Sequence, residues 1–248
     1  MLYNQICKKN TPLFFGHRGA PYLEPENSIR SIYKSIEMGS HGVEMDIQIT
    51  EDNHIILFHD DFIDFRGKQY FINKISYKKV VELCKNTNTH QPDLFKELIP
   101  IINKYSNIIF NIEIKSTQLN NDKILNYILN KISINTLQNQ CILSSFNYYL
   151  LYQLRFLFLY KGPIAPILSS QHLKLGLTIN KLIILLLNPD FLHININNTT
   201  QKLVDWVHSK SKRINVYTVN DIPTLHKCLE LNIDGIFTDN HALYHSKM

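Results

Sequence analysis

The clearest pattern in the chain is an alternation of apolar and polar residues over positions 42–49. Apolar side chains at the odd positions from 43 to 49 alternate with Glu44, Asp46 and Gln48. A period of two predicts a β-strand with both carboxylates on one face, starting about 6.6 Å apart. A solvated sheet face would explain this pattern equally well, so a functional interpretation needs support from the rest of the chain.

Eight further runs of β-branched and aromatic residues predict strands. They lie at 13–15, 54–59, 108–115, 141–145, 164–168, 191–196, 214–219 and 235–238. Segments with apolar residues at helical spacing separate most of them. These segments predict helices at about 29–38, 77–84, 93–105, 122–132, 147–158, 178–187, 200–210 and 222–231. Asn27 or Ser28 is the expected N-cap of the first helix, and Gly39 is expected to end it.

Alternating strands and helices predict a parallel sheet with right-handed crossovers. If residues 54–59 form the return arm of a hairpin, eight strands remain, the number that a closed (β/α)8 TIM barrel requires. We therefore predict an α/β chain of one domain, covering about 12–242 of residues 1–248, with a β-hairpin excursion and a short insertion after the second strand. A doubly wound open sheet is the competing fold, although no GxGxxG follows a strand.

Composition narrows the class of protein. The chain has 248 residues, 44% hydrophobic content and a net charge of +5, values typical of a globular protein. Its lysines form no dense basic track, so we expect no nucleic-acid partner. The four cysteines match no zinc pattern and predict reduced thiols. The absence of an apolar run after Lys8 and Lys9, and of any bilayer-length run, predicts a cytoplasmic protein without stable membrane insertion.

Polar residues gather where the predicted strands end. His17-Arg18 follows the first strand, His59-Asp60 follows the hairpin arm, and Glu113 and Lys115 share a face of the 108–115 strand. Active sites of TIM barrels lie at the carboxyl ends of the strands. Each residue alone has an ordinary structural explanation, such as an ion pair for Glu113 and Lys115. Their coincidence on one rim favours a site.

The residue types indicate phosphodiester chemistry. Three carboxylates suit one hard divalent cation, Ca²⁺ or Mg²⁺, which can offset charge on a phosphoryl group. Two histidines can divide the roles of general base and general acid. Arginine and lysine suit phosphate oxygens. No GxSxG motif indicates acyl transfer instead.

Eight short motifs occur in order between about residues 13 and 240. They are Gly16-His17-Arg18-Gly19, Pro25-Glu26-Asn27-Ser28, Gly42-Val43-Glu44-Met45-Asp46, Phe58-His59-Asp60, Ile112-Glu113-Ile114-Lys115, Ser145-Phe146, Tyr217-Thr218-Val219-Asn220 and Asp234-Gly235-Ile236-Phe237-Thr238-Asp239. This set resembles the glycerophosphodiester phosphodiesterase family, which shares its (β/α)8 barrel with bacterial phosphatidylinositol-specific phospholipase C.

The resemblance implies a hydrolase that converts a small glycerophosphodiester to glycerol 3-phosphate and an alcohol. It implies His17 and His59 as the acid/base pair, with one divalent cation. The implied cation ligands are Glu44, Asp46 and Glu113. The implied substrate contacts are Arg18 and Lys115 at the phosphate, and Phe146 and Tyr217 beside the alcohol group.

The chain departs from the family pattern near the substrate. Tyr217 stands where the family usually has Trp, and Ser28 where it has Thr. The segment after His59-Asp60 and the Pro92-Asp93-Leu94 motif also differ. These departures lie outside the implied catalytic set. The segment between His59 and Glu113 is expected to supply a loop or small insertion over the substrate.

Two other functions remain open. A lysophospholipase D or phospholipase C-like enzyme would need an apolar rim, which residues 172–187 could supply, although core packing is the simpler explanation for them. A non-catalytic binding or scaffold barrel would be expected to lack some of the two histidines and three carboxylates, and all five are present. Head-group preference, the choice of cation, a cyclic phosphate intermediate, the oligomeric state and the pathway stay open.

Overall fold

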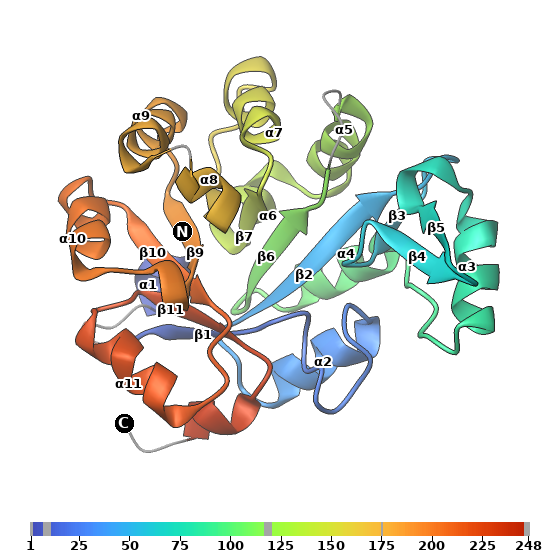
Figure 1. Ribbon diagram of the computed structural model, residues 1–248, viewed down its shortest axis with the longest axis horizontal. Coiled ribbons are helices and arrows are strands. Elements are labelled where there is room, and N and C mark those ends of the chain that lie inside the picture. The colour runs from blue at the N-terminus through green and yellow to red at the C-terminus, as the bar shows by residue number, and fades with distance from the viewer. Residues whose placement is uncertain (1, 7–10, 117–120, 175, 246–248) are drawn as a thin grey trace.

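Eight parallel strands pair side by side in an unbroken ring, with helices around the outside (Figure 1). The computed structural model describes residues 2–6, 11–116, 121–174 and 176–245. The ring comprises β1 (Leu13–Gly16), β2 (Gly42–Ile49), β6 (Ile109–Ile114), β7 (Cys141–Ser145), β8 (Ile164–Leu168), β9 (Phe191–Asn195), β10 (Arg213–Tyr217) and β11 (Gly235–Thr238). It closes because β1 pairs with both β2 and β11. The predicted (β/α)8 barrel is confirmed, and the open sheet is excluded.

The helices around the ring are α2 (Ile29–Glu37), α3 (Tyr77–Asn86), α4 (Phe95–Lys104), α5 (Asp122–Lys131), α6 (Ile134–Gln140), α7 (Tyr148–Tyr152), α8 (Ser170–Lys174), α9 (Leu177–Leu187), α10 (Gln201–Ser209) and α11 (Ile222–Glu230). All except α6 and α8 occupy predicted segments, usually within two residues. Side-chain caps define several starts: Ser28 accepts a hydrogen bond from the Ser31 amide, as expected for α2. Gly39 follows α2 with φ +84°, the left-handed geometry that glycine adopts without strain.

An excursion follows β2, as the sequence predicts. β3 (Ile55–Leu57) returns antiparallel to β2, which confirms the hairpin arm. A second hairpin, formed by β4 (Phe62–Phe65) and β5 (Lys68–Phe71), was not predicted. Its two-residue turn has positive φ at Arg66 and Gly67, which is the geometry that matches strand twist in a tight hairpin. The β4–β5 hairpin and α3 form the insertion beside the barrel (Figure 1).

One helix prediction was wrong in its bounds, and three short helices, α8 among them, were not predicted. The helix expected over 147–158 is α7 followed by a π-helical turn, η2 (Gln153–Leu157). A second helix, α6, follows α5 before β7. A short helix, α1 (Leu2–Ile6), precedes the barrel. Such short elements depend on tertiary packing more than on local pattern, because isolated short helices are marginal in water.

The alternation in β2 separates the interior of the barrel from the layer between strands and helices. Val43, Met45 and Ile47 pack in one cluster with residues of α2 and α4. Glu44 and Asp46 point the other way, into the barrel. The apolar residues therefore anchor β2 and fix the direction of its carboxylates.

The amino-terminal end of the barrel is filled by α1. The Tyr3 ring is 1% exposed and packs edge-on against Phe191, with 4.7 Å between ring centroids. Its hydroxyl donates to Asn215 Oδ1 at 3.2 Å and to the Asp234 carbonyl at 3.0 Å. This plug leaves the carboxyl end as the open end of the barrel.

Within the described residues, Cys84, Cys141 and Cys228 are free and buried, and Cys7 lies outside them. None of the helices described combines the length and apolarity needed to cross a bilayer.

The α1 plug predicts a stability effect. We expect Tyr3→Ala to lower the free energy of unfolding by about 3 kcal/mol, because a large buried ring leaves a cavity. Tyr3→Phe, which removes only the hydroxyl, should lower it by about 1 kcal/mol. Urea denaturation measures both. Tyr22→Ala, at a residue 64% exposed, is the matched control and should change little. If the Tyr3→Ala protein were as stable as this control, α1 would not contribute to the free energy of unfolding.

Candidate active site

A cavity of about 270 Å³ lies inside the carboxyl end of the barrel. All nine site residues predicted from the sequence line it, although they come from six different parts of the chain. They are His17, Arg18, Glu44, Asp46, His59, Glu113, Lys115, Phe146 and Tyr217. Asn111, His193 and Asn195 also line it. Barrel closure therefore gathers these side chains at the end where TIM-barrel chemistry occurs.

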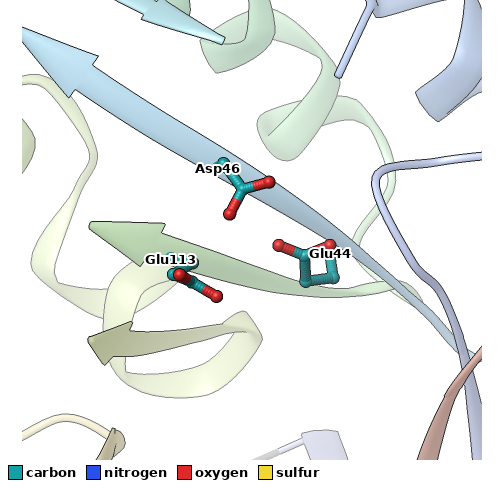
Figure 2. Close-up of side chains that lie close together, drawn as sticks. All are labelled: Glu44, Asp46 and Glu113. Carbon is teal, nitrogen blue, oxygen red and sulfur yellow. The ribbon is translucent and has the colours of Figure 1, made fainter. Parts of the chain in front are cut away.

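The three predicted carboxylates form one cluster. Parallel pairing of β2 with β6 puts Asp46 directly opposite Glu113, and Glu44 lies two residues earlier on the same face as Asp46. Figure 2 shows the side chains from the two strands directed toward one another. One oxygen of each lies within 4.8 Å of the others, and the residues are only 3%, 1% and 9% exposed for Glu44, Asp46 and Glu113.

Burial and mutual repulsion perturb these carboxylates unequally. Burial, with repulsion from Asp46 and Glu113, raises the pKa of Glu44 well above its ordinary value. Burial and Asp46 raise the pKa of Glu113 to about 7. Burial would also raise the pKa of Asp46, but the Lys115, His59 and Arg18 charges outweigh it and lower that pKa. The raised pKa values mean that Glu44 and Glu113 bind a proton readily. A bound cation would reduce the repulsion and allow all three carboxylates to stay ionised.

Two basic side chains compensate the cluster. Lys115 Nζ lies 2.6 Å from Glu113 Oε1 and 3.2 Å from Asp46 Oδ1. Burial alone would lower the pKa of Lys115, but these two carboxylates raise it above its ordinary value. The Arg18 amide donates to Glu44 Oε2 at 2.7 Å, and its guanidinium pairs with Glu26 and, at 3.5 Å, with Asp46.

The donor set fits one divalent cation. Glu44 Oε1 is buried without a hydrogen-bond partner among the described residues, which is costly for a carboxylate oxygen. Glu44, Asp46 and Glu113 are the one group of at least three possible ligand residues found in the described part of the chain. Oxygen-only ligands favour Ca²⁺ or Mg²⁺ over softer metals.

Asn27 is a site residue that the sequence analysis assigned only as a possible helix cap. Its side chain donates to Asp46 Oδ2 and accepts from the Asp46 amide, both at 2.9 Å. This pair of bonds fixes the Asp46 carboxylate. Asn27 has φ +51°, a region that asparagine tolerates better than most residues. Its place beside Glu26 in the Pro25-Glu26-Asn27-Ser28 motif was the available signal.

Each predicted catalytic histidine has a carboxylate partner. His17 Nδ1 lies 2.8 Å from Asp239 Oδ1, and His59 Nδ1 lies 2.7 Å from Asp60 Oδ1. Asn220 donates to the other Asp239 oxygen at 2.7 Å. The Nε2 atoms are therefore left for other chemistry. The sequence placed Asp239 at a strand end but gave it no role toward His17, because these residues lie 222 positions apart.

An aromatic wall borders the carboxylates. The Phe146 and Tyr217 rings meet edge to face, with centroids 6.5 Å apart, and Lys115 Nζ lies 5.5 Å from the Phe146 centroid. The Tyr217 hydroxyl donates to the Leu168 carbonyl. Beyond this wall is a wider groove of about 850 Å³, which shares His59, Lys115 and Phe146 with the cavity.

His193 closes the base of the cavity. It is 1% exposed, and its Nε2 lies 3.3 Å from Asn215 Nδ2. Asn215 in turn accepts the hydrogen bond from the Tyr3 hydroxyl. Burial lowers the pKa of His193 to about 3, so its ring is neutral at physiological pH.

Comparison with known proteins gives one consistent result. A model of the glycerophosphoryl diester phosphodiesterase family matches residues 17–243. A glycerophosphodiester phosphodiesterase of Caldanaerobacter subterraneus subsp. tengcongensis is 26% identical over 242 residues, 92% of this chain and 94% of that one.

Solved structures show the same fold. A Thermotoga maritima glycerophosphodiester phosphodiesterase matches with a TM-score of 0.73 and 23% identity, covering 95% of this chain and 97% of that one. An Oleispira antarctica phosphodiesterase, solved with the product sn-glycerol-3-phosphate, matches with a TM-score of 0.77 and 19% identity, covering 98% of each chain.

The buried His193 predicts a pH effect on stability. Its folded pKa of about 3 lies below the ordinary value of 6.5, so the unfolded chain binds the proton more readily. This contribution to stability is complete above about pH 6.5 and is lost as the pH falls toward 3. Between about pH 7.5 and 5, the free energy of unfolding of the wild type should fall by about 2 kcal/mol more than that of His193→Gln. Urea denaturation at both pH values measures the difference, and parallel losses would contradict the prediction.

Proposed function

Since this chain belongs to the glycerophosphoryl diester phosphodiesterase family and is a phosphoric diester hydrolase, we propose that it hydrolyses small glycerophosphodiesters with one divalent cation and a pair of histidines. The products are glycerol 3-phosphate and an alcohol. The observation that carries the proposal is the meeting of His17, His59 and the carboxylates Glu44, Asp46 and Glu113 in one cavity. The complex of the Oleispira antarctica phosphodiesterase with sn-glycerol-3-phosphate supports this class of product. We propose about residues 12–242 as the catalytic domain.

Glu44, Asp46 and Glu113 are the proposed cation ligands. A bound Ca²⁺ or Mg²⁺ would supply positive charge that stabilises the phosphoryl oxygens as negative charge develops on them. Asn27 keeps Asp46 in place for this role through its two hydrogen bonds.

Arg18 and Lys115 are the proposed phosphate contacts. Both line the cavity, and both are held among the carboxylates by ion pairs. A substrate phosphate would bring acceptor oxygens to the same place. Charge-assisted hydrogen bonds from an ammonium and a guanidinium bind and orient such oxygens.

His17 and His59 are the proposed acid and base. One ring takes a proton from the nucleophile, and the other gives a proton to the oxygen of the leaving alcohol. The nucleophile is water, or the neighbouring glycerol hydroxyl in a route through a cyclic phosphate. Asp239 and Asp60 each lie within hydrogen-bond distance of an Nδ1 atom, which orients the ring and leaves Nε2 to face the substrate.

Phe146 and Tyr217 are the proposed wall beside the alcohol group. Both line the small cavity, and Phe146 also lines the wider groove, where the alcohol has room. The free thiols of Cys84, Cys141 and Cys228 support a cytoplasmic location, where disulfides are rare.

A second candidate substrate is a lysophospholipid. The observation in its favour is the apolar surface of α9, where Leu182 and Leu186 are each 63% exposed. The expectation that residues 172–187 serve mainly in the core was only partly right. Ile184 and Leu187 are buried, as expected, but Leu182 and Leu186 are not. Relative turnover of glycerophosphoethanolamine and a lysophospholipid at equal concentration distinguishes the two substrates.

The histidine assignment predicts the effect of two substitutions. His17→Ala and His59→Ala should each reduce kcat/KM for glycerophosphocholine by about 10²–10⁴, because each removes a proton-transfer group. Enzyme-coupled detection of glycerol 3-phosphate measures turnover, and circular dichroism checks the fold. His226→Ala, at an exposed position on α11, is the matched control and should keep normal turnover. Normal turnover in either active-site variant would defeat the assignment.

The cation site predicts dependence on Ca²⁺ or Mg²⁺. Treatment with EDTA should abolish turnover, and one of the two cations should restore it. Calorimetric titration of the EDTA-treated protein should show one site, with affinity at least about tenfold weaker in Glu44→Gln. Glu82→Gln, a like change at an exposed residue of α3, is the control. Equal cation affinity in the wild type and Glu44→Gln would remove Glu44 from the ligand set, whatever the result for the histidines.

A further inference from the structure

Exposed apolar side chains are concentrated on one side of the barrel. Nine of the fourteen large apolar residues exposed in the described part of the chain lie between positions 149 and 186. We call these nine residues the apolar flank: Tyr149, Tyr152, Phe156, Leu157, Leu159, Ile179, Leu182, Leu185 and Leu186. They come from α7, the π-helical turn η2 with the residues just after it, and α9.

The two parts of the apolar flank lie beside each other. Arg155, in η2, donates to the carbonyls of Leu187 and Asn188 at the end of α9, and also to the carbonyl of Tyr160. Leu154 and Leu187 belong to one buried cluster. Figure 1 likewise shows α7 and α9 as neighbours on the outside of the ring. The flank is therefore continuous across two helices.

Helix α9 is apolar on both sides. Ile184 and Leu187 face the core, whereas Leu182 and Leu186 on the outer side are each 63% exposed. A surface helix of a globular protein normally carries polar residues on its outer face, and a helix that is apolar all round is normally covered. Large exposed apolar patches mark interaction surfaces. The aromatic residues of α7 and η2 extend the same surface, with Tyr152 and Phe156 in ring contact.

The segment of the chain that carries the apolar flank is basic. Residues 123–189 contain no aspartate or glutamate, although the chain has 21 acidic residues. The same segment contains six basic residues: Lys123, Lys131, Arg155, Lys161, Lys174 and Lys181. Lys161 and Lys174 are exposed, next to η2 and at the end of α8. Asp190, which pairs with Arg155 at 3.5 Å, adds one acidic side chain at the edge of the flank, so the exposed lysines leave a net positive charge there. An apolar face with a net positive border is complementary to an anionic lipid surface, which attracts lysines and accepts apolar side chains.

We propose that the apolar flank docks the enzyme reversibly on the surface of an anionic bilayer. The leucines and aromatic rings enter the interfacial region, and the lysines contact the lipid phosphates. A second copy of the chain is the less suitable occupant, because a twofold contact would oppose basic side chains to basic side chains.

Docking would also set the orientation of the active site. The wide groove beside the cavity is lined by Phe146 and Asn147 before α7 and by Gln171 and His172 of α8. Tyr149 of the apolar flank follows Asn147 by two residues. The groove therefore opens at the end of the flank nearest the active site, which would bring it close to the lipid surface.

Co-sedimentation with vesicles tests the proposal without relying on catalysis. The wild type should bind vesicles that contain phosphatidylcholine with about a quarter phosphatidylglycerol, and bind pure phosphatidylcholine weakly. The Leu182→Gln/Leu186→Gln variant should partition at least about tenfold less, because two apolar side chains no longer enter the interface. The Lys161→Gln/Lys174→Gln variant should also bind less, and added salt should weaken binding of the wild type.

Matched controls distinguish docking from non-specific adsorption to vesicles and from unfolding. Ile134→Gln and Ile222→Gln replace exposed apolar residues of α6 and α11 and should bind as the wild type does. Turnover of soluble glycerophosphoethanolamine should be unchanged in all of these variants. Absence of wild-type binding to anionic vesicles, or equal loss in the Ile134→Gln control, would overturn the proposal. A concentration-dependent dimer that Leu182→Gln/Leu186→Gln makes monomeric would also overturn it, because a second copy would then cover the flank.

Discussion

The burial of three carboxylates within 4.8 Å of one another is the constraint on which this site depends. Like charges in a weakly polarisable interior repel strongly and lose their hydration. Lys115 and Arg18, which lie beside Asp46, reduce this repulsion. Hydrogen bonds from Asn27 and the Arg18 amide replace part of the lost hydration. These groups keep the carboxylates in place without fully neutralising them. A hard divalent cation is the species that the remaining negative charge suits best.

The barrel makes this arrangement possible by holding each charge on a rigid strand. The outward side chains of β2 pack against α2 and α4, so its inward side chains have little freedom to turn away. The partner of His17 comes from the opposite end of the chain, because β11 lies next to β1 in the closed ring. Orientation of the imidazole by Asp239 is thus a direct consequence of barrel closure.

The two sides of the molecule have different surface chemistry. Acidic residues, including those of the proposed cation site, lie at or before residue 122 and after residue 189. The intervening segment carries only basic charge and most of the exposed apolar area. The groove next to the active site opens where these two regions meet. The proposed route of substrate access and the proposed surface attachment therefore involve adjacent parts of one molecule.

The sequence alone determined the β/α alternation, because strand and helix periods are local properties that side-chain polarity reveals. The same periodicity put Glu44 with Asp46, and Glu113 with Lys115, on common strand faces. Only the tertiary structure decided that Asp46 stands opposite Glu113, since strand register depends on packing of the whole sheet. It also decided the partnership of His17 with Asp239, the role of Asn27 beside Asp46, and the exposure of Leu182 and Leu186. These features are contacts between distant segments, or the lack of a covering segment, and no local pattern contains that information.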